Sequence, residues 1–211
     1  MKNWTGFNQT DFQVFSIPGL TPRMEALKTH IRPKLETLGE NICPFLSELT
    51  EREMYVHVAK HARRTVHPPD ETWVAWSPEK RGYKAHPHFQ TGIREDHVFA
   101  MFALIYECPH KPRFAQNLSR QIDELLPGIP SSFVISQDHT RPEVTSLEEL
   151  GQPGLQKILK RLEQIKKAEF LCGVQIQRQD PILQEPERLE QKIKETFQVL
   201  TPLYRLAVLS E

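Results

Sequence analysis

Glycine and cysteine are scarce in this sequence, and each shortage excludes a class of protein. Only nine of the 211 residues are glycine, and they form neither the G-x-G-x-x-G nor the P-loop pattern that cradles phosphates in many nucleotide-binding enzymes. The three cysteines are far apart and include no C-x-x-C pair, so we expect neither a disulfide framework nor cysteine chemistry. We therefore predict that the protein carries no cofactor.

Long apolar runs and an excess of one charge are also absent. The longest apolar run, residues 98–106, is well short of the ~18 residues that a membrane-spanning helix needs, and residues 1–7 lack the apolar stretch of a signal peptide. Lysine plus arginine equals aspartate plus glutamate at 27 each, so the overall charge points to no partner. We expect a cytoplasmic protein that does not bind membranes, and the pattern predicts no particular oligomeric state.

Chain length and the order of hydrophobic periods predict the fold class. A chain of 211 residues lies within the size range of one domain, and we expect residues 1–211 to form a single domain. Strand-like patterns gather in the first half of the chain, while most helical stripes follow later. That order favours an α+β fold, in which helices pack against a mostly antiparallel sheet, over repeated βαβ units.

Stretches of alternating or continuous apolar residues predict the strands. The third and fourth strands are separated only by residues 94–96, so an antiparallel meander is the simplest arrangement of the first four. Residues 98–106 are apolar on both faces, which predicts a central strand in a sheet that helices cover on both sides. The six predicted strands are residues 54–61, 72–76, 86–93, 97–107, 133–136 and 169–177.

Apolar residues at helical spacing predict four helices. In the first, Thr21 is a candidate N-cap and Pro22 occupies the first helical position. Pro33 interrupts the stripe that follows, so it either kinks one helix or divides it into two. The last helix could extend beyond Pro202. The stripes are Leu27, Ile31, Leu35 and Leu38; Phe114, Leu118, Ile122 and Leu125; Leu155, Ile158, Leu159, Leu162 and Ile165; and Leu189, Ile193, Phe197 and Leu200.

The residues that suggest chemistry are concentrated between His57 and His88. This segment holds five of the nine histidines, and its six lysines and arginines against three acids give a local net charge of plus three. Paired arginines offer planar forks suited to phosphate or carboxylate, so the segment favours an anionic ligand. The candidate anion-binding residues are Lys60, Arg63, Arg64, Arg81 and Lys84, and the candidate groove histidines are His57, His61 and His88.

The same segment carries a resemblance to a known family. In chain order, the segment contains HVAKHARRTV, PPDETWVAW, KRGYK and PHFQ-x-G. These stretches resemble the YktB family of uncharacterised bacterial proteins, and the resemblance extends over nearly the whole chain. It implies a compact α+β domain in the bacterial cytoplasm. It implies no substrate, cofactor or catalytic residue, so the function has to be argued from the residues themselves.

Two functional interpretations of the basic segment stay open. Its basic face could bind single-stranded nucleic acid or another polyanion, with Trp73, Trp76 or Tyr83 stacking on bases, although tryptophans in strands usually belong to the core. Alternatively, the protein could be an enzyme that acts on a phosphorylated or carboxylated substrate. The arginines would then clamp the substrate, and the histidines would act as acid and base.

The third interpretation is that these charges are ordinary solvated surface, neutralised by Asp70, Glu71 and Glu79. Strand geometry also argues against one compact pocket. In a meander, the loop after His61 and the turn at residues 80–84 lie at opposite ends of the strands, roughly 15 Å apart for strands of about five residues. A single phosphate pocket would then require residues 63–71 to fold back.

Three weaker patterns complete the candidates. The H-x-x-x-H and H-x-H spacings within residues 57–88 can converge on zinc, but the neighbouring lysines and arginines disfavour a cation, so we predict no metal. The polar cluster Asp138-His139-Thr140-Arg141 follows a predicted strand, and its Asp-His pair could act as acid and base. Its neighbours Pro142 and Ser146 are equally typical of a turn and a helix cap. An exposed apolar stripe on the last helix would instead suggest a partner protein, but burial is the simpler expectation.

Overall fold

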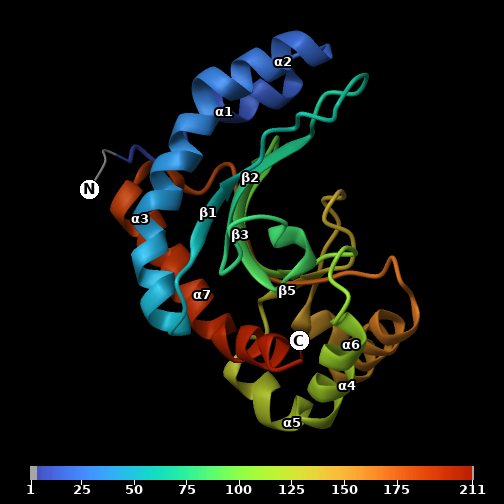
Figure 1. Ribbon diagram of the computed structural model, residues 1–211. Helices are drawn as coiled ribbons and strands as arrows, with labels where there is room; N and C mark the ends of the chain where they lie inside the picture. Colours follow the sequence, from blue (N-terminus) through green and yellow to red (C-terminus); the bar gives the residue numbers. More distant parts are fainter. Residues whose placement is uncertain (1–3, 211) are drawn as a thin grey trace.

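A computed structural model describes residues 4–210, and one seven-stranded sheet runs through its centre (Figure 1). The strand order is β1-β2-β3-β4-β7-β5-β6, and every neighbouring pair is antiparallel. The predicted α+β fold with an antiparallel sheet is therefore confirmed. The strands are β1 (Tyr55–Val58), β2 (Glu71–Ser77), β3 (His88–Arg94), β4 (His97–Leu104), β5 (Val134–Ser136), β6 (Thr145–Ser146) and β7 (Phe170–Gln177).

The first four strands form the predicted meander, and the fourth lies in the middle of the sheet. All eight residues of β4 are buried, which agrees with the apolar character of both its faces. Within the meander, Gly92 of β3 lies opposite Phe99 of β4. A Cβ atom at position 92 would lie 2.6 Å from the carbonyl oxygen of Thr72. Glycine is therefore required for β2 and β3 to pair beside the Phe99 ring.

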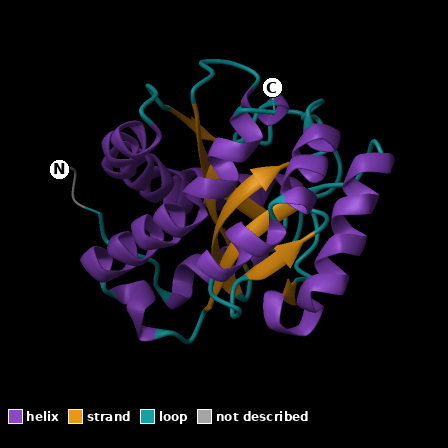
Figure 2. Ribbon diagram, turned by 90° about the horizontal axis from the view of Figure 1, so that it is seen from below, coloured by secondary structure: helices purple, strands orange, loops and turns teal. Residues whose placement is uncertain are grey.

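The long helices cover one face of the sheet (Figures 1 and 2). Helix α3 packs on β1 and β2, and α7 packs on β3, β4 and β7. Helix α4 reaches the same face through Phe114, whose ring lies beside Phe102 and Phe170. The α-helices are α1 (Gln9–Gln13), α2 (Leu20–Ala26), α3 (Arg32–Thr50), α4 (Lys111–Arg120), α5 (Ile122–Leu125), α6 (Leu147–Gln164) and α7 (Pro186–Val208). The other helical turns are η1 (Val14–Ser16), η2 (Leu27–Ile31), η3 (Tyr83–Ala85), η4 (Leu126–Gly128) and η5 (Pro181–Gln184).

The first predicted helix is present, although its N-cap differs from the prediction, and the structure decides between the two alternatives for Pro33. It begins at Leu20 with Gly19 as its N-cap, so the assignment of Thr21 as N-cap is wrong. Pro33 does not divide the helix, because α2, the π-helical turn η2 and α3 follow one another directly. A wider π turn just before a proline relieves the clash of its ring with the preceding turn. Farther along the chain, α7 continues through Pro202, as the sequence allowed.

A large apolar core lies between the sheet and the helices. Trp76 of β2 is fully buried in it, with its ring centroid 5.5 Å from that of Phe197. Its indole Nε1 donates to the carbonyl oxygen of Gly39 in α3 at 2.9 Å. Trp76 is therefore a core residue, and its candidacy for stacking on a ligand is withdrawn. No helix within residues 4–210 has the length and apolar character needed to cross a membrane.

The opposite face of the sheet, here called the open face, carries no long helix from the described part of the chain, residues 4–210. Its centre is a small apolar cluster of Phe99, Met101, Ala103, Ile105 and Leu171, against which Trp73, Val134 and Val144 pack. These partners come from β2, β5 and the loop before β6. The prediction that helices cover β4 on both faces is therefore wrong for this face, because strand neighbours and connecting segments supply the cover. Polar side chains surround the cluster, and the candidate site lies among them.

Candidate anion-binding site

The connection between β2 and β3 folds back over the open face (Figure 1). Gly82 has φ 71°, a left-handed conformation that glycine adopts easily, and the turn η3 follows it. Tyr83 then reaches Trp73 of β2, whose indole Nε1 donates to the Tyr83 hydroxyl at 2.8 Å. The Nζ atom of Lys84 lies 5.4 Å from the Trp73 ring centroid. The fold-back therefore removes the expected separation between Lys84 and the loop that follows His61.

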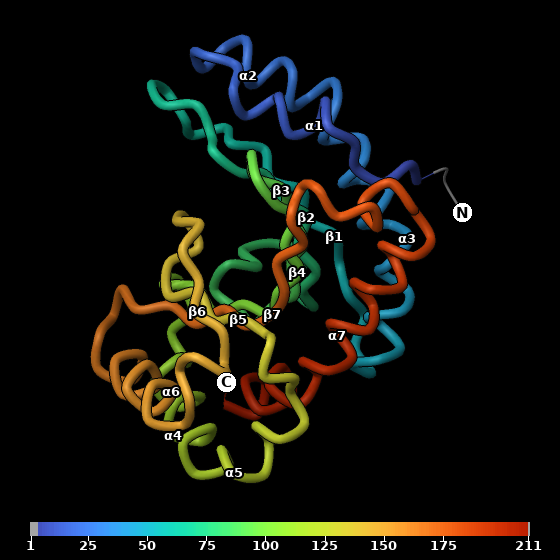
Figure 3. Tube along the Cα trace, turned by 180° about the vertical axis from the view of Figure 1, so that it is seen from behind, coloured from blue at the N-terminus to red at the C-terminus, as the bar shows by residue number. Residues whose placement is uncertain are grey.

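The second part of the site is an arm of residues 59–70 that extends toward α2 (Figures 1 and 3). Its shape is set by internal hydrogen bonds, since the Arg64 guanidinium donates to the carbonyl oxygens of His67 and Pro68, each at 3.3 Å. Arg23 of α2 anchors its far end, donating to the carbonyl oxygen of Pro69 and to the carboxylate of Asp70, each at 3.1 Å. The arm is thus fixed both internally and to the helix beside it.

The arm and the fold-back enclose one cleft of about 380 Å³. Of the five candidate anion-binding residues, four line it, and Arg81 does not. Of the three candidate histidines, only His61 lines it. Trp73 and Tyr83 supply its aromatic surface, and Glu107 is its one carboxylate among the lining residues. The lining is Val58, Ala59, Lys60, His61, Ala62, Arg63, Arg64, Trp73, Tyr83, Lys84 and Glu107.

His57 and His88 lie behind Tyr83 and hold its ring. The His57 ring stacks on that of Tyr83 with centroids 4.7 Å apart, and the His88 ring meets it edge-on at 5.1 Å. The Nε2 atom of His57 hydrogen-bonds the carbonyl oxygen of Glu79, and the Nδ1 atom of His88 hydrogen-bonds that of His86, each at 2.8 Å. These two histidines therefore belong to the support of the cleft, not to its lining.

The electrostatics of the cleft come from its lysines and arginines. Burial, together with the charges of Arg64, Arg32 and Lys84, lowers the pKa of His61 to about 4, so this imidazole is neutral near pH 7. Its Nε2 atom is hydrogen-bonded to the Thr72 hydroxyl at 3.1 Å. Burial also raises the pKa of Tyr83 to about 12, so its phenol stays protonated. Four cationic side chains and the Glu107 carboxylate are left as the charges of the lining.

A second polar group lies on the open face, and the sequence predicted only one of its two main residues. His139 was a candidate with Asp138, but its Nδ1 lies 2.9 Å from both carboxylate oxygens of Glu169, and its backbone N–H donates to Glu169 at 2.7 Å. Asp138 instead accepts hydrogen bonds from Thr140. Glu169 lies just before β7, and no local pattern linked it to residue 139. The His139 ring centroid lies 6.4 Å from that of Trp73.

The histidines of residues 57–88, whose spacing suggested zinc, do not belong to any close group of potential metal ligands within residues 4–210. Within residues 4–210, the one group of three potential ligands that lie close together is Asp138, His139 and Glu169. The Glu169 carboxylate already accepts the N–H groups of Tyr106 and His139. These bonds make the group a hydrogen-bonded cluster that ties the loop after β5 to the start of β7.

Comparison with known proteins places the chain in a family. A family model described as a domain of unknown function, DUF1054, matches residues 7–204. The chain belongs to the DUF1054 family. Among the relatives of this chain, a UPF0637 protein of Oceanobacillus iheyensis is 47% identical over 203 residues, covering 96% of this chain and 97% of the relative. UPF0637 proteins of Bacillus licheniformis and Bacillus cytotoxicus are 46% and 48% identical over 200 residues, covering 95% of this chain and 95% and 96% of the relatives. The resemblance to an uncharacterised bacterial family is thus confirmed.

Proposed function

We propose that this protein binds a small phosphorylated ligand in the cleft between the arm and the fold-back. The observation that supports the proposal is that Lys60, Arg63 and Arg64 of the arm line the same cleft as Lys84 of a separate connection. Guanidinium forks and ammonium groups converging on one concavity favour a phosphate group, which accepts several charge-assisted hydrogen bonds at once. Because the whole chain has no net charge, this concentration is a local feature of the site.

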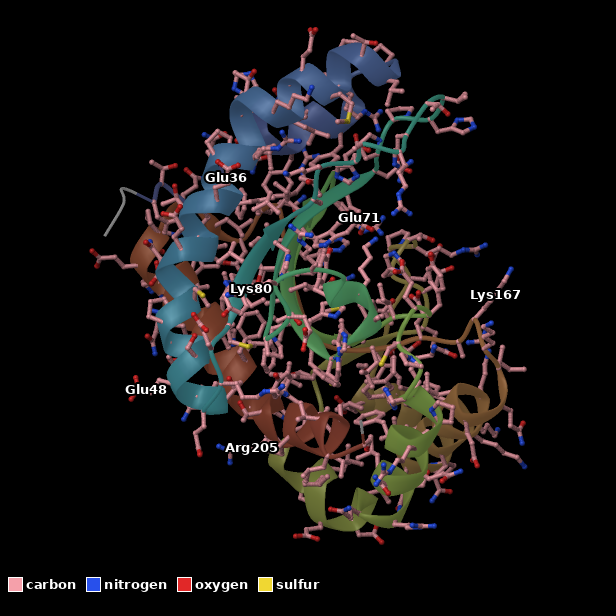
Figure 4. The ribbon with its side chains drawn as sticks, in the orientation of Figure 1. Glu36, Glu48, Glu71, Lys80, Lys167 and Arg205 are labelled. Atoms are coloured by element: carbon pink, nitrogen blue, oxygen red, sulfur yellow. The ribbon has the colours of Figure 1, made fainter. Side chains whose placement is uncertain are left out.

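The alternative of a solvated, internally neutralised surface is disfavoured by where the local acids lie. Asp70 pairs with Arg23 at 3.1 Å, and Glu71 pairs with Arg94 at 2.6 Å. The second pair is buried on both sides, and Glu71 lies on the open face away from α3 and α7 (Figure 4). Two of the three acids that were expected to neutralise the basic segment are therefore engaged with arginines from other elements.

The enzymatic alternative requires a different base from the one the sequence suggested. His88 is fully buried, and His57 is bound to a backbone carbonyl. His139, oriented by Glu169, has an arrangement that suits general base catalysis, because a carboxylate bound at Nδ1 leaves Nε2 as the proton acceptor. A catalytic role for it, and a cytoplasmic location for the protein, stay predictions.

The proposal is tested by titration calorimetry with inorganic pyrophosphate at low salt. We expect binding that weakens at least tenfold in a Lys60→Ala, Arg63→Ala double variant, because each hydrogen bond between charged groups contributes about 1.5–3 kcal/mol and about 1.4 kcal/mol is tenfold in affinity. Lys80→Ala, Arg81→Ala is the matched control. It removes the same charges from the same connection that carries Lys84, at positions that do not line the cleft.

The control should keep wild-type affinity. Equal weakening by both double variants would mean that pyrophosphate senses only the general charge of the surface, and no binding by the wild-type protein would refute the proposal directly.

A further inference from the structure

We infer that the ligand of the cleft is a nucleoside monophosphate, with its base stacked on Trp73 and its phosphate held by the cationic residues of the arm and Lys84. This inference rests on the proposed function and names its ligand class. It is drawn from three features of the lining: a fixed aromatic surface, a single carboxylate and a limited volume.

The aromatic surface is rigid before any ligand arrives. The polar end of the Trp73 indole is bound to the Tyr83 hydroxyl, and the Tyr83 ring is held by His57 and His88 on two sides. The two aromatic side chains thus have their polar ends satisfied, and what they offer the cleft is ring surface. A base that stacks on an aromatic ring already fixed in place loses little of its binding free energy to ordering the protein.

Lys84 connects this surface to the anion site. Its ammonium lies above the Trp73 ring, at 5.4 Å from the centroid, in a cation–π contact. A phosphate entering the cleft would attract this flexible side chain, which can swing off the ring toward Arg63 and Arg64. A flat base could then take the place of the ammonium against the Trp73 ring, beside the His61 ring, whose centroid lies 5.5 Å from that of Trp73 in an edge-on contact. A single ligand that carries both a phosphate and an aromatic base could attract Lys84 with its phosphate and stack its base on Trp73.

Glu107 is the feature that distinguishes a nucleotide from a bare phosphate. A carboxylate in the lining repels any simple anion, and the cleft would bind inorganic phosphate better without it. Base edges, in contrast, carry N–H donors that a glutamate accepts. Glu107 lines the same cleft as Trp73 and Tyr83. A base stacked on Trp73 could therefore donate an N–H group to the Glu107 carboxylate.

The volume favours one nucleotide over a polymer. A cleft of about 380 Å³ lies near the lower end of small-molecule sites, which run from roughly 300 to 1,000 Å³. Sites for single-stranded nucleic acid follow the backbone over about 4–16 nucleotides for each binding fold. Glu107 would also oppose a continuing chain of phosphates. A base joined to a phosphate could belong to a free mononucleotide or to a nucleic acid strand. The cleft fits the free mononucleotide better.

The test compares ligands that differ by one part. The dissociation constants of AMP, GMP, CMP and UMP are measured by titration calorimetry beside those of ribose 5-phosphate, pyrophosphate and a single-stranded decanucleotide. We expect at least one mononucleotide to bind tenfold or more tightly than ribose 5-phosphate. In a Trp73→Ala variant that preference should fall to about threefold or less, while ribose 5-phosphate affinity stays within a factor of two.

Glu107→Gln is the second variant, because Glu107 is exposed and its replacement leaves the apolar core untouched even if Trp73→Ala fails to fold. Removing the negative charge should strengthen ribose 5-phosphate binding while the preference for the mononucleotide falls at least threefold. A merely structural role of Glu107 would shift both ligands equally and would overturn the inference.

The remaining outcomes separate the inference from the proposed function. If pyrophosphate and ribose 5-phosphate bind as tightly as every mononucleotide, the nucleotide is excluded and the phosphate site stands. Tighter binding of the decanucleotide than of each mononucleotide at 0.1 M salt would identify a strand instead and overturn the inference. If none of these anions binds, both proposals fail together.

Discussion

The surroundings of His57, His61 and His88 decide the chemistry available to each of these partly or fully buried histidines. The sequence suggested His57, His61 and His88 as a set, since they share a segment rich in basic residues. In the structure only His61 meets the cleft, while His57 and His88 support Tyr83. All three have pKa values lowered chiefly by burial. Their shared property is therefore that they stay neutral in the folded protein, which makes stability depend on pH.

We predict that the free energy of unfolding falls as the pH is lowered from about 6.5 toward 4. In the unfolded chain His88 takes up a proton near pH 6.5, whereas burial lowers its pKa in the folded protein to about 4. Between these values the unfolded state binds more protons, so stability rises with pH and is lost on acidification. At about 1.36 kcal/mol for each pH unit, His88 alone should remove roughly 2 kcal/mol between pH 7.5 and 5.

Urea unfolding at pH 7.5 and pH 5 measures this dependence. A His88→Gln variant lacks the titrating imidazole, so its difference between the two pH values should be smaller than that of the wild type by about the same amount. An unchanged difference in the variant would show that His88 does not contribute to the pH dependence.

At the scale of helices and strands, local patterns predicted most of the fold. Alternation of apolar residues located the meander, and helical stripes located α3, α6 and α7. Two elements, β6 and η2, were not predicted, because they depend on contacts outside their own segment. Strand β6 has only two residues and exists through its pairing with β5. The π turn η2 relieves the steric clash of the Pro33 ring with the preceding turn. The sequence predicted this clash but not the π turn that relieves it.

Gly173 of β7 shows an element-scale constraint that can be tested. A Cβ atom there would lie against the carbonyl oxygen of Ala100 and only 2.8 Å from the Cα atom of Met101. Both neighbours are backbone atoms of β4, so the two central strands would have to move apart. We expect Gly173→Ala to lower the free energy of unfolding by about 1–3 kcal/mol, as overpacking does.

Gly128→Ala is the control for this measurement, since a Cβ at that position would meet nothing within 4 Å. Urea unfolding should place the control within about 0.5 kcal/mol of the wild type. A Gly173→Ala variant as stable as this control would mean that β4 and β7 separate at little cost.

At the scale of the whole molecule, the sequence predicted which residues belong to the site but not how the fold brings them together. Four of the five predicted cationic residues line one cleft because the β2–β3 connection folds back, which places Tyr83 on Trp73. Local periodicity carries no information on that fold-back. The pairing of His139 with Glu169 joins residues 30 positions apart, and the Arg23–Asp70 anchor joins residues 47 apart. Such contacts follow from the packing of the sheet, so composition alone predicted Arg81 as readily as Lys84.

The expectation of a single domain leads to a prediction about unfolding. One core cluster runs from Trp4 to Ala207, and the N-terminal segment is joined to the start of α7 where the Trp4 indole donates to the carbonyl oxygen of Pro186 at 3.0 Å. A shared core should unfold as one cooperative unit. Far-UV circular dichroism and tryptophan fluorescence should therefore give the same urea midpoint. The midpoints should also coincide in a Trp73→Phe variant, whose fluorescence comes from Trp4 and Trp76 on the helix-covered side. Separate midpoints in either protein would show that the open face and the helical side unfold independently, and the single-domain assignment would be wrong.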